Sequence, residues 1–567
     1  FQKDVIQLTQ DLTADSWKLP FSQRVDSVTN FQHTYAQQDD LIVMDLVEGD
    51  VSDVSELALK IREQIALAEP TLAGKLINSA GTTTGVNVTI NLPGKVMTEV
   101  PEIAIAAREL VTKYRAQYPN IEIRPSGFAF MNNAFMETSM MDMMTLMPLM
   151  FGALLLIMAL LVRSIFATFA TLLVIMFATM SAMGFGGWMG FVLTPPSAIT
   201  PNIVMTLAIA DSIHIIMSMM KCMHAGMPKK EAIIESIRIN MQPVFLTSLT
   251  TIIGFLTLNF AESPPFWHLG NMTAMGIAAA FIFSMTMLPA LLILLPVKFK
   301  AKPENHRSKM DGFAEFVVKR SRPLLVVSLL VTIGMGSMTS KIELNDQFVE
   351  YFAPSMDFRA DTDFMTENLS GIYTAEYSVP ARGSEQISDP EYLQNLENLT
   401  EYLRMQPGVD HVFSMSDIFK RLNKNMHNDS QDWYKTPDEQ DMAAQYLLLY
   451  EFSLPYGLDL TDRVNIDKSA TRITVTLTDM TTKELRAFKA QSDQWIKNNL
   501  PDFMHSEATS PGIMFSFISE RNITAMVFGN LISLILISGI IMFALRSFKI
   551  GAVSLVPNLL PLAVGFG

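Results

Sequence analysis

Eight apolar stretches constrain what this 567-residue chain can fold into. A helix needs roughly 20 residues to cross the hydrocarbon core of a membrane, and most of these stretches reach that length. Inside the lipid no solvent pairs with the backbone, so each span must be a helix that satisfies its own hydrogen bonds. The expected spans are Met141–Val162, Ala170–Leu193, Ser197–Met220, Met241–Phe260, Met272–Val297, a short one at Pro323–Met338, Ile523–Leu545 and Ile550–Gly567. We therefore predict a polytopic α-helical membrane protein.

The charges are divided unevenly between the polar blocks and the apolar part. The net charge is −14, but residues 1–139 carry −7 and residues 341–520 carry −15, which leaves +8 for the remainder. Lys and Arg fall in every second connection between spans, whereas residues 194–197 and 261–269 contain none. Because Lys and Arg are enriched in cytoplasmic loops, we expect both acidic blocks to lie on the opposite, external side of the membrane.

The single cysteine bears on the location of the protein. Cys222 falls in a connection that we expect to be cytoplasmic, so neither external block can form a disulfide. This suits a bacterial inner membrane whose external blocks face the periplasm. The chain opens at Phe1 rather than at a start methionine, and block 1–139 needs a segment that exports it. We therefore expect a further span before Phe1.

A weak internal repeat relates the two halves of the chain. Residues 124–130 lead into a span that ends at Arg163, and residues 510–515 lead into a span that ends at Arg546, about 385 residues later. Each half would hold one span, one external domain and five further spans, and such repeats are a transporter architecture. The two-fold repeat is apparently truncated, because three spans of the second half would lie beyond Gly567.

We predict that the acidic blocks are α+β domains, because segments with an apolar residue at every second position alternate with segments that have the pattern of amphipathic helices. Strands are expected at 40–47, 85–92, 120–123, 376–379, 409–414 and 472–478, and helices at 51–69, 100–118, 390–405 and 481–499. Both blocks are compatible with a βαββαβ, ferredoxin-like fold. The predicted organisation is a first periplasmic porter domain (1–139), five transmembrane helices (140–297), a cytoplasmic amphipathic linker (298–322), a transmembrane helix (323–340), a second periplasmic porter domain (341–520) and the final transmembrane helices (521–567).

Asp211 lies in the middle of the span Ser197–Met220. A charged side chain at that depth costs at least ~2.5–3.5 kcal/mol, so such residues usually line a pathway or relay protons. His214 follows three residues later and Ser218 seven later, which predicts that all three share one helix face. An ion-coupled transporter is the favoured interpretation. The structural alternative is a neutral, hydrogen-bonded Asp that only joins helices.

This arrangement resembles the resistance-nodulation-division (RND) superfamily. The order of spans and domains matches, and residues 207–214, LAIADSIH, are similar to the fourth-span motif of one branch of it. That branch includes mycobacterial membrane protein large, hopanoid exporters, Patched and Dispatched. Ala208 and Ala210 stand where the family often has Gly, and Ser212 stands where the drug-efflux branch usually has a second Asp. The resemblance therefore favours lipids or other membrane-embedded hydrophobic molecules as substrates.

The resemblance implies a secondary active transporter rather than an enzyme. It would be driven by the proton-motive force and would export or traffic lipids from the inner membrane, and spans two to six match the sterol-sensing domain of Patched-like relatives. Asp211 and His214 would relay the proton, Ser212 and Thr206 would hydrogen-bond the ionised carboxylate, and Asn202 would support them. For His214 alone, a neutral helix-packing histidine is the alternative.

The methionine run beginning at Met136 leaves several alternatives open. One interpretation is a hydrophobic path for lipid entry, lined by Met140, Met144 and Met147. The alternatives are that these methionines only pack against neighbouring helices, or that they bind Cu(I) as in a heavy-metal pump. A lipid- or sterol-sensing receptor, a drug efflux permease and a secretion accessory are further alternatives. The sequence contains no Walker loop, nucleophile triad or zinc-ligand spacing, so we expect no catalytic residue, metal or cofactor.

The partners follow from the same interpretation. We expect membrane lipids or hydrophobic small molecules, protons, a periplasmic carrier protein and further copies of this chain, but no nucleic acid.

Overall fold

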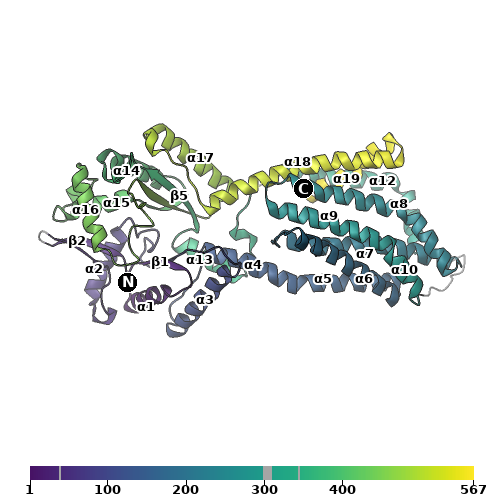
Figure 1. The fold of residues 1–567 in the computed structure, drawn as a ribbon, viewed down its shortest axis with the longest axis horizontal. Helices are drawn as coiled ribbons and strands as arrows, with labels where there is room; N and C mark the ends of the chain where they lie inside the picture. The colour runs from purple at the N-terminus through teal and green to yellow at the C-terminus, as the bar shows by residue number, and fades with distance from the viewer. Residues whose placement is uncertain (38–39, 298–308, 343–344, 567) are drawn as a thin grey trace. The chain divides into compact units, whose positions relative to one another are not determined.

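The computed structural model describes residues 1–37, 40–297, 309–342 and 345–566, and it contains two compact units (Figure 1). Unit 1 consists of Phe1–Phe135 and Asn345–Ser519, and unit 2 consists of Met136–Leu344 and Glu520–Gly567. Unit 1 therefore combines nearly all of both acidic blocks. The two units are described separately.

The first half of unit 1 contains two small sheets and three helices. β1 (Ser22–Ser27) pairs antiparallel with β4 (Val86–Ile90), and β2 (Gln32–Gln37) pairs antiparallel with β3 (Asp40–Asp45). The helices are α1 (Lys3–Ser16), α2 (Glu56–Ala68) and α3 (Glu99–Gln117). In the described residues this half therefore has two separate two-stranded sheets, whereas a βαββαβ domain has one sheet of four strands.

The strand expected at 120–123 is wrong, because this segment is irregular. Pro119 and Pro125 flank it, and proline lacks the N–H that a strand ladder uses. The carbonyl oxygen of Ile123 also accepts a hydrogen bond from Nε of Arg115 at 3.1 Å, so it is engaged by a side chain rather than by a neighbouring strand.

The second half of unit 1 is built on a three-stranded antiparallel sheet in the order β5-β7-β6. The strands are β5 (Tyr373–Pro380), β6 (Val409–Phe413) and β7 (Ala470–Leu477). Every second side chain of β5 is buried, beginning with Tyr373, as expected for a sheet with one face on the core. A single bridge between Glu376 and Thr509 stands at the far edge of β5, where a βαββαβ fold would have its fourth strand.

Five helices accompany this sheet in the described residues. Two of them lie in the segment 415–470, for which no structure was predicted: α15 (Met415–Asn425) and α16 (Gln440–Ser453). The others are α13 (Asp357–Asn368), α14 (Pro390–Arg404) and α17 (Thr482–Asn499). α17 begins with a capping box between Thr481 and Glu484, which satisfies backbone N–H groups at the helix start. α14 and α15 bury leucine, isoleucine and phenylalanine side chains in the core of this half.

The two halves of unit 1 are joined by side chains far apart in the sequence. Oγ1 of Thr34 in β2 donates to Oδ1 of Asn425 at 2.6 Å, and Nδ2 of Asn425 donates back to the carbonyl oxygen of Thr34 at 3.3 Å. The backbone N–H of Ala36 donates to Oδ2 of Asp429 at 3.0 Å. The hairpin β2–β3 is therefore held by the end of α15 and the turn after it.

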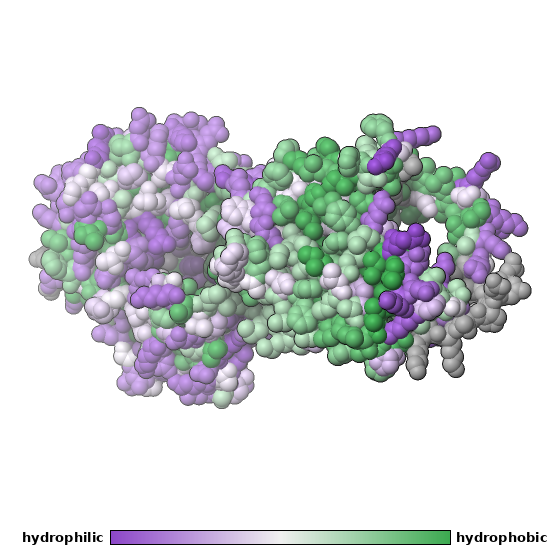
Figure 2. Space-filling view, turned by 45° about the vertical axis from the view of Figure 1, so that its right-hand side comes forward, coloured by the Kyte–Doolittle hydropathy of each residue, from purple (hydrophilic) through white to green (hydrophobic). Residues whose placement is uncertain are grey.

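Unit 2 is a bundle of long apolar helices. Its elements are α4 (Phe128–Met144), which begins in unit 1, then α5 (Leu146–Val162), α6 (Ile165–Trp188), α7 (Thr200–His224), α8 (Lys229–Leu256), α9 (Pro264–Met285), α10 (Met287–Leu294), α11 (Lys309–Lys319), α12 (Ser321–Gly336), α18 (Pro511–Leu545), which also begins in unit 1, and α19 (Phe548–Phe566). Figure 2 shows apolar side chains gathered over these helices.

Six helices in the described residues are long and apolar enough to cross a membrane, against the eight expected. α4 and α5 together form one of them, Phe128–Val162. The short span expected at Pro323–Met338 corresponds to α12, which is apolar but has only 16 residues, and the span expected from Ile550 is the helix α19, which the six do not include.

Unit 2 is held together by close packing of α6, α7 and α9. At Gly276 in α9, an added Cβ would lie 2.3 Å from Cγ2 of Val204 and 2.9 Å from Cβ of Ala182. The three backbones approach this closely because small residues stand at the contact, as is common between membrane helices.

The expected linker 298–322 is described only in part. Residues 298–308 lie outside the described residues, and α11 follows them. Its apolar side chains Phe313, Phe316 and Val318 are exposed. The helix that was predicted is present at Lys309–Lys319, and its placement on a membrane surface stays a prediction.

Candidate functional site

Asp211 is buried inside the helix bundle of unit 2, with only 7% of its surface exposed. It stands in α7, whose first turn contains Pro201, a favourable residue at a helix start. The hydroxyl of Ser248 in α8 donates to Oδ2 of Asp211 over a long 3.5 Å. In the part of the chain that the structure describes, no Lys, Arg or His forms an ion pair with Asp211.

This setting makes the charge of Asp211 energetically important. An ionised carboxylate buried without a cation pays a large desolvation cost, and one long hydrogen bond from a neutral hydroxyl compensates for little of it. Uptake of a proton by the carboxylate removes that cost. The site therefore provides a group whose charge state is sensitive to its surroundings.

A polar row on α8 accompanies Asp211. Ser236, Asn240 and Ser248 are buried and spaced by multiples of four residues, so they lie along one helix face. The hydroxyl of Ser236 donates to the carbonyl oxygen of Ile215 in α7 at 2.5 Å, and Nδ2 of Asn240 donates to the carbonyl oxygen of Ser236 at 2.8 Å. This row joins α8 to α7 near Asp211.

This polar row was not predicted, although the sequence contains a signal for it. The expected span began at Met241, whereas α8 begins at Lys229, so Ser236 and Asn240 were assigned to a cytoplasmic connection. Polar residues at four-residue intervals in an otherwise apolar helix would have predicted a face that packs on another polar residue.

Ser212 is fully buried beside Asp211. Among the described residues its hydroxyl has no hydrogen-bond partner, so it does not bind the carboxylate in this structure. Such a buried, unpaired hydroxyl is uncommon.

The structure does not bring His214 to Asp211. His214 is exposed, and no hydrogen bond or ion pair joins the two in the described residues. Three residues turn an α-helix by about 300°, so His214 lies roughly 60° around α7 from Asp211 and outside the face that packs on α8. The structure therefore does not join His214 to the carboxylate, and its role in a proton relay stays a prediction.

Thr206 and Asn202 also lie away from the carboxylate. Thr206 is exposed and its hydroxyl donates to the carbonyl oxygen of Asn202 at 2.8 Å, one turn earlier in the same helix. Asn202 is half-buried. Neither side chain hydrogen-bonds to Asp211 in the described part of the chain.

The methionines predicted to line a substrate path lie on an open helix surface. Met140 and Met144 in α4 are 58% and 72% exposed, and Met147 in α5 is half-buried. Within the residues described, no group of three or more His, Cys, Asp or Glu gathers near them or elsewhere in a way that would hold a metal ion.

Comparison with known proteins identifies the family. The MMPL family matches residues 19–324, which is more than half of the chain. Over 112 residues, 19% of this chain and 29% of the relative, the chain is 32% identical to the membrane protein MJ1562 of Methanocaldococcus jannaschii.

Two solved structures are also similar. SecDF, a translocon-associated membrane protein from Thermus thermophilus, has a TM-score of 0.42 at 12% identity, over 95% of this chain and 61% of its own. The hedgehog release protein Disp from the water bear Hypsibius dujardini has a TM-score of 0.46 at 14% identity, over 86% of this chain and 63% of its own. This chain spans less than two thirds of each of these relatives.

The family match confirms the resemblance to the branch of the RND superfamily that includes mycobacterial membrane protein large. With six helices that are long and apolar enough to cross a membrane, this chain is a multi-pass membrane protein of the MMPL family.

Proposed function

We propose that this chain is part of an RND-type transporter that uses a proton gradient to move lipids or other hydrophobic molecules out of the bacterial inner membrane. Asp211 is the group that takes up and releases the proton. The observation that carries the proposal is its burial between membrane helices without a cationic partner in the described residues.

The coupling follows from the cost of the charge. When Asp211 is protonated, the packing of α7 on α8 accommodates it without a counter-ion. When it loses the proton, the helices must move or admit water to solvate the carboxylate, since Ser248 alone contributes one 3.5 Å contact. Proton uptake from one side and release to the other then drives a cycle of the bundle, and each charge gains ~2.3 kcal/mol per 100 mV.

The choice of a hydrophobic substrate rests on the family and on the surface of unit 2. Met140, Met141, Met143 and Met144 form an exposed, pliable apolar face on α4, which suits contact with a lipid chain. On this proposal both acidic blocks lie in the periplasm, where a carrier protein would receive the substrate.

The test is lipid analysis of inner and outer membranes from a deletion strain that carries wild type, Asp211→Asn or Glu231→Gln. Glu231 is a matched control, because it is an exposed carboxylate at the start of α8, away from the methionine face of α4. We expect one lipid class to be misplaced in the deletion, and we expect wild type and Glu231→Gln, but not Asp211→Asn, to restore it.

Three other results would change the proposal. Restoration by Asp211→Asn would show that the carboxylate is structural. An unchanged lipid distribution together with accumulated secretory precursors would favour a secretion accessory. Lipid binding that survives in Asp211→Asn without any lipid movement in wild type would favour a lipid sensor.

A further inference from the structure

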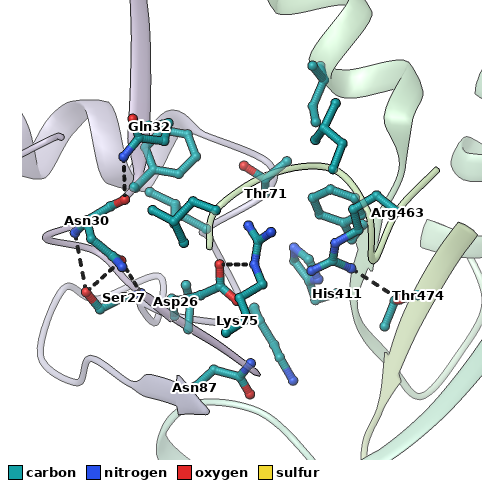
Figure 3. A pocket seen from close by; sticks show the side chains of 18 of the residues that line it. Asp26, Ser27, Asn30, Gln32, Thr71, Lys75, Asn87, His411, Arg463 and Thr474 are labelled. Atoms are coloured by element: carbon teal, nitrogen blue, oxygen red, sulfur yellow. Dashed lines mark hydrogen bonds and ion pairs between the residues drawn. The ribbon is translucent and has the colours of Figure 1, made fainter. Parts of the chain in front are cut away.

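Unit 1 contains a cavity of about 120 Å³ that is lined by residues from both of its halves (Figure 3). The first half contributes residues of β1 and of the segment that follows α2, and the second half contributes residues of β6, α15 and β7. A cavity of this size accommodates a small anion together with a short apolar group.

The lining is rich in cations, and three of them are paired. Each of three arginines forms an ion pair with a carboxylate: Arg24 with Asp26 at 2.8 Å, Arg463 with Asp462 at 3.0 Å and Arg421 with Glu69 at 3.2 Å. These pairs explain why the arginines are tolerated in a partly buried place. In the described residues, none of these three carboxylates forms an ion pair with the fourth cation of the lining.

Lys75 is that remaining cation. It is half-buried, and its Nζ forms no hydrogen bond or ion pair with any described residue. Burial lowers the pKa of Lys75, while Glu376, Asp410 and Asp26 act on it only over longer distances. Figure 3 shows Lys75 in the lining together with Asn87, whose side-chain amide is a further hydrogen-bond donor.

His411 adds no charge to the cavity. Burial lowers its pKa to about 3. Its Nε2 lies 2.9 Å from the carbonyl oxygen of Pro70, which can only accept, so Nε2 carries a proton and donates it. The positive charge that remains uncompensated in the cavity is therefore that of Lys75.

Beside polar side chains such as Thr71 and Thr474, the lining contains apolar ones, among them Leu72, Leu76, Phe413 and Leu460. The apolar side chains provide contact for alkyl carbons but offer no partner to an ammonium group. A ligand that matched both parts of the cavity would have one oxyanion and a short apolar chain.

We infer that this cavity binds an oxyanion, a phosphate or carboxylate that carries an apolar group, and that Lys75 is its ammonium partner. The ligand's charge would pair with Nζ of Lys75, and its chain would lie against the leucines. Charge-assisted hydrogen bonds of this kind are stronger than neutral ones. The inference concerns unit 1 alone and does not depend on Asp211 or on transport.

The experiment measures binding of butyl phosphate, inorganic phosphate and 1-butanol by calorimetry, with the full chain in phosphatidylcholine nanodiscs. We expect wild type to bind butyl phosphate more tightly than inorganic phosphate and to show no binding of butanol. Lys75→Gln should weaken butyl phosphate binding by about ten- to a hundredfold, the range for a charge-assisted hydrogen bond. Lys60→Gln, which changes an exposed lysine of α2, should bind as wild type does.

Two outcomes would overturn the inference: equal binding of butyl phosphate by Lys75→Gln and wild type, or binding of butanol as tight as that of butyl phosphate. Equal affinity for the two phosphates would support the oxyanion site and would identify a free anion, rather than an amphiphile, as its ligand. Lys75→Arg, which keeps the charge, should retain most of the binding and so guards against loss through misfolding.

Discussion

The two units treat buried charge in opposite ways. In unit 1, Asp417 has no exposed side-chain surface, yet Arg404 lies 2.5 Å and Lys420 3.4 Å from its carboxylate. In unit 2, Asp211 is also buried, and its contact is a serine hydroxyl at 3.5 Å. Paired buried charges fix a structure, because removal of one partner leaves the other uncompensated. An unpaired buried carboxylate instead makes the structure depend on whether that carboxylate is protonated. Unit 1 therefore has the character of a scaffold, whereas Asp211 makes unit 2 a candidate switch.

The largest effect on stability is expected from Asp417→Ala. It leaves Arg404, whose side chain is 29% exposed, without its carboxylate partner, while Lys420 keeps its ion pair with Glu397. Breaking a buried pair from one side costs about 3–5 kcal/mol, and the partial exposure of Arg404 places the expected loss at the lower end of that range. Chemical denaturation followed by tryptophan fluorescence measures it, with Glu401→Ala on the exposed face of α14 as the control. A loss no larger than that of the control would show that unit 1 does not depend on its paired charges.

Unit 2 should instead be most sensitive to a change in side-chain volume where its helices touch. Gly276→Ala places a methyl group 2.3 Å from Val204 and 2.9 Å from Ala182, and overpacking of this kind typically costs about 1–3 kcal/mol. Thermal unfolding in detergent tests it. Gly184→Ala in α6 is the matched control, because nothing lies within 4 Å of its added Cβ. Equal midpoints for the two variants would contradict the close packing of α6, α7 and α9.

A pH dependence is expected in unit 1 from His411. Its pKa is about 3 in the folded protein against an ordinary value of 6.5, so below pH 6.5 the unfolded chain binds a proton that the folded chain does not. The free energy of unfolding should then fall by up to about 1.4 kcal/mol per pH unit as the pH drops from 6.5 towards 3.

Substitution of His411 by Gln should remove that part of the slope, measured by denaturation between pH 7 and pH 5. A slope unchanged by His411→Gln would refute the assignment.

The smallest effect on stability is expected from Asp211→Asn. The amide keeps the shape of the side chain and removes no ion pair, so the free energy of unfolding should change by less than about 1 kcal/mol. Thermal unfolding of this variant beside Asp417→Asn gives the direct contrast between the units. A loss of stability at Asp211 as large as that at Asp417 would mean that the carboxylate holds the bundle together.

The apolar part of the fold was largely predictable, because a membrane leaves a long apolar segment little choice but a helix. Each of the six long helices overlaps an expected span, and three of them begin 12 or 13 residues earlier than expected: Phe128–Val162, Lys229–Phe260 and Pro511–Leu545. The residues at which these helices begin and end were less predictable. α8 begins at Lys229 rather than Met241, and its polar first part packs on α7 through the hydroxyl of Ser236.

The acidic blocks were less predictable, because strand pairing depends on contacts far apart in the sequence. The positions of β3, β4, β5, β6 and β7 were close to expectation, but β1, β2 and α1 were not predicted. Nor does any local pattern reveal that Thr34 binds Asn425.

The candidate site was predicted in its central residue and missed in its surroundings. Asp211 stands out by its chemistry in an apolar span. His214 was assigned to it by helix spacing, yet spacing gives an angle around α7 and not the width of the buried face. Ser248 is 37 residues away on another helix, so only the packing of α7 on α8 reveals it.

The contact between Thr34 and Asn425 also sets an order of events during biosynthesis. The ribosome adds about 5–20 residues per second, so the 391 residues between these partners delay their meeting by roughly 20–80 s. Throughout that interval the hairpin β2–β3 lacks α15, and its polar groups await a partner that has not been synthesised. Unit 1 therefore completes its fold only after most of the bundle has been made, and the nascent first half is the stage most exposed to proteases and chaperones.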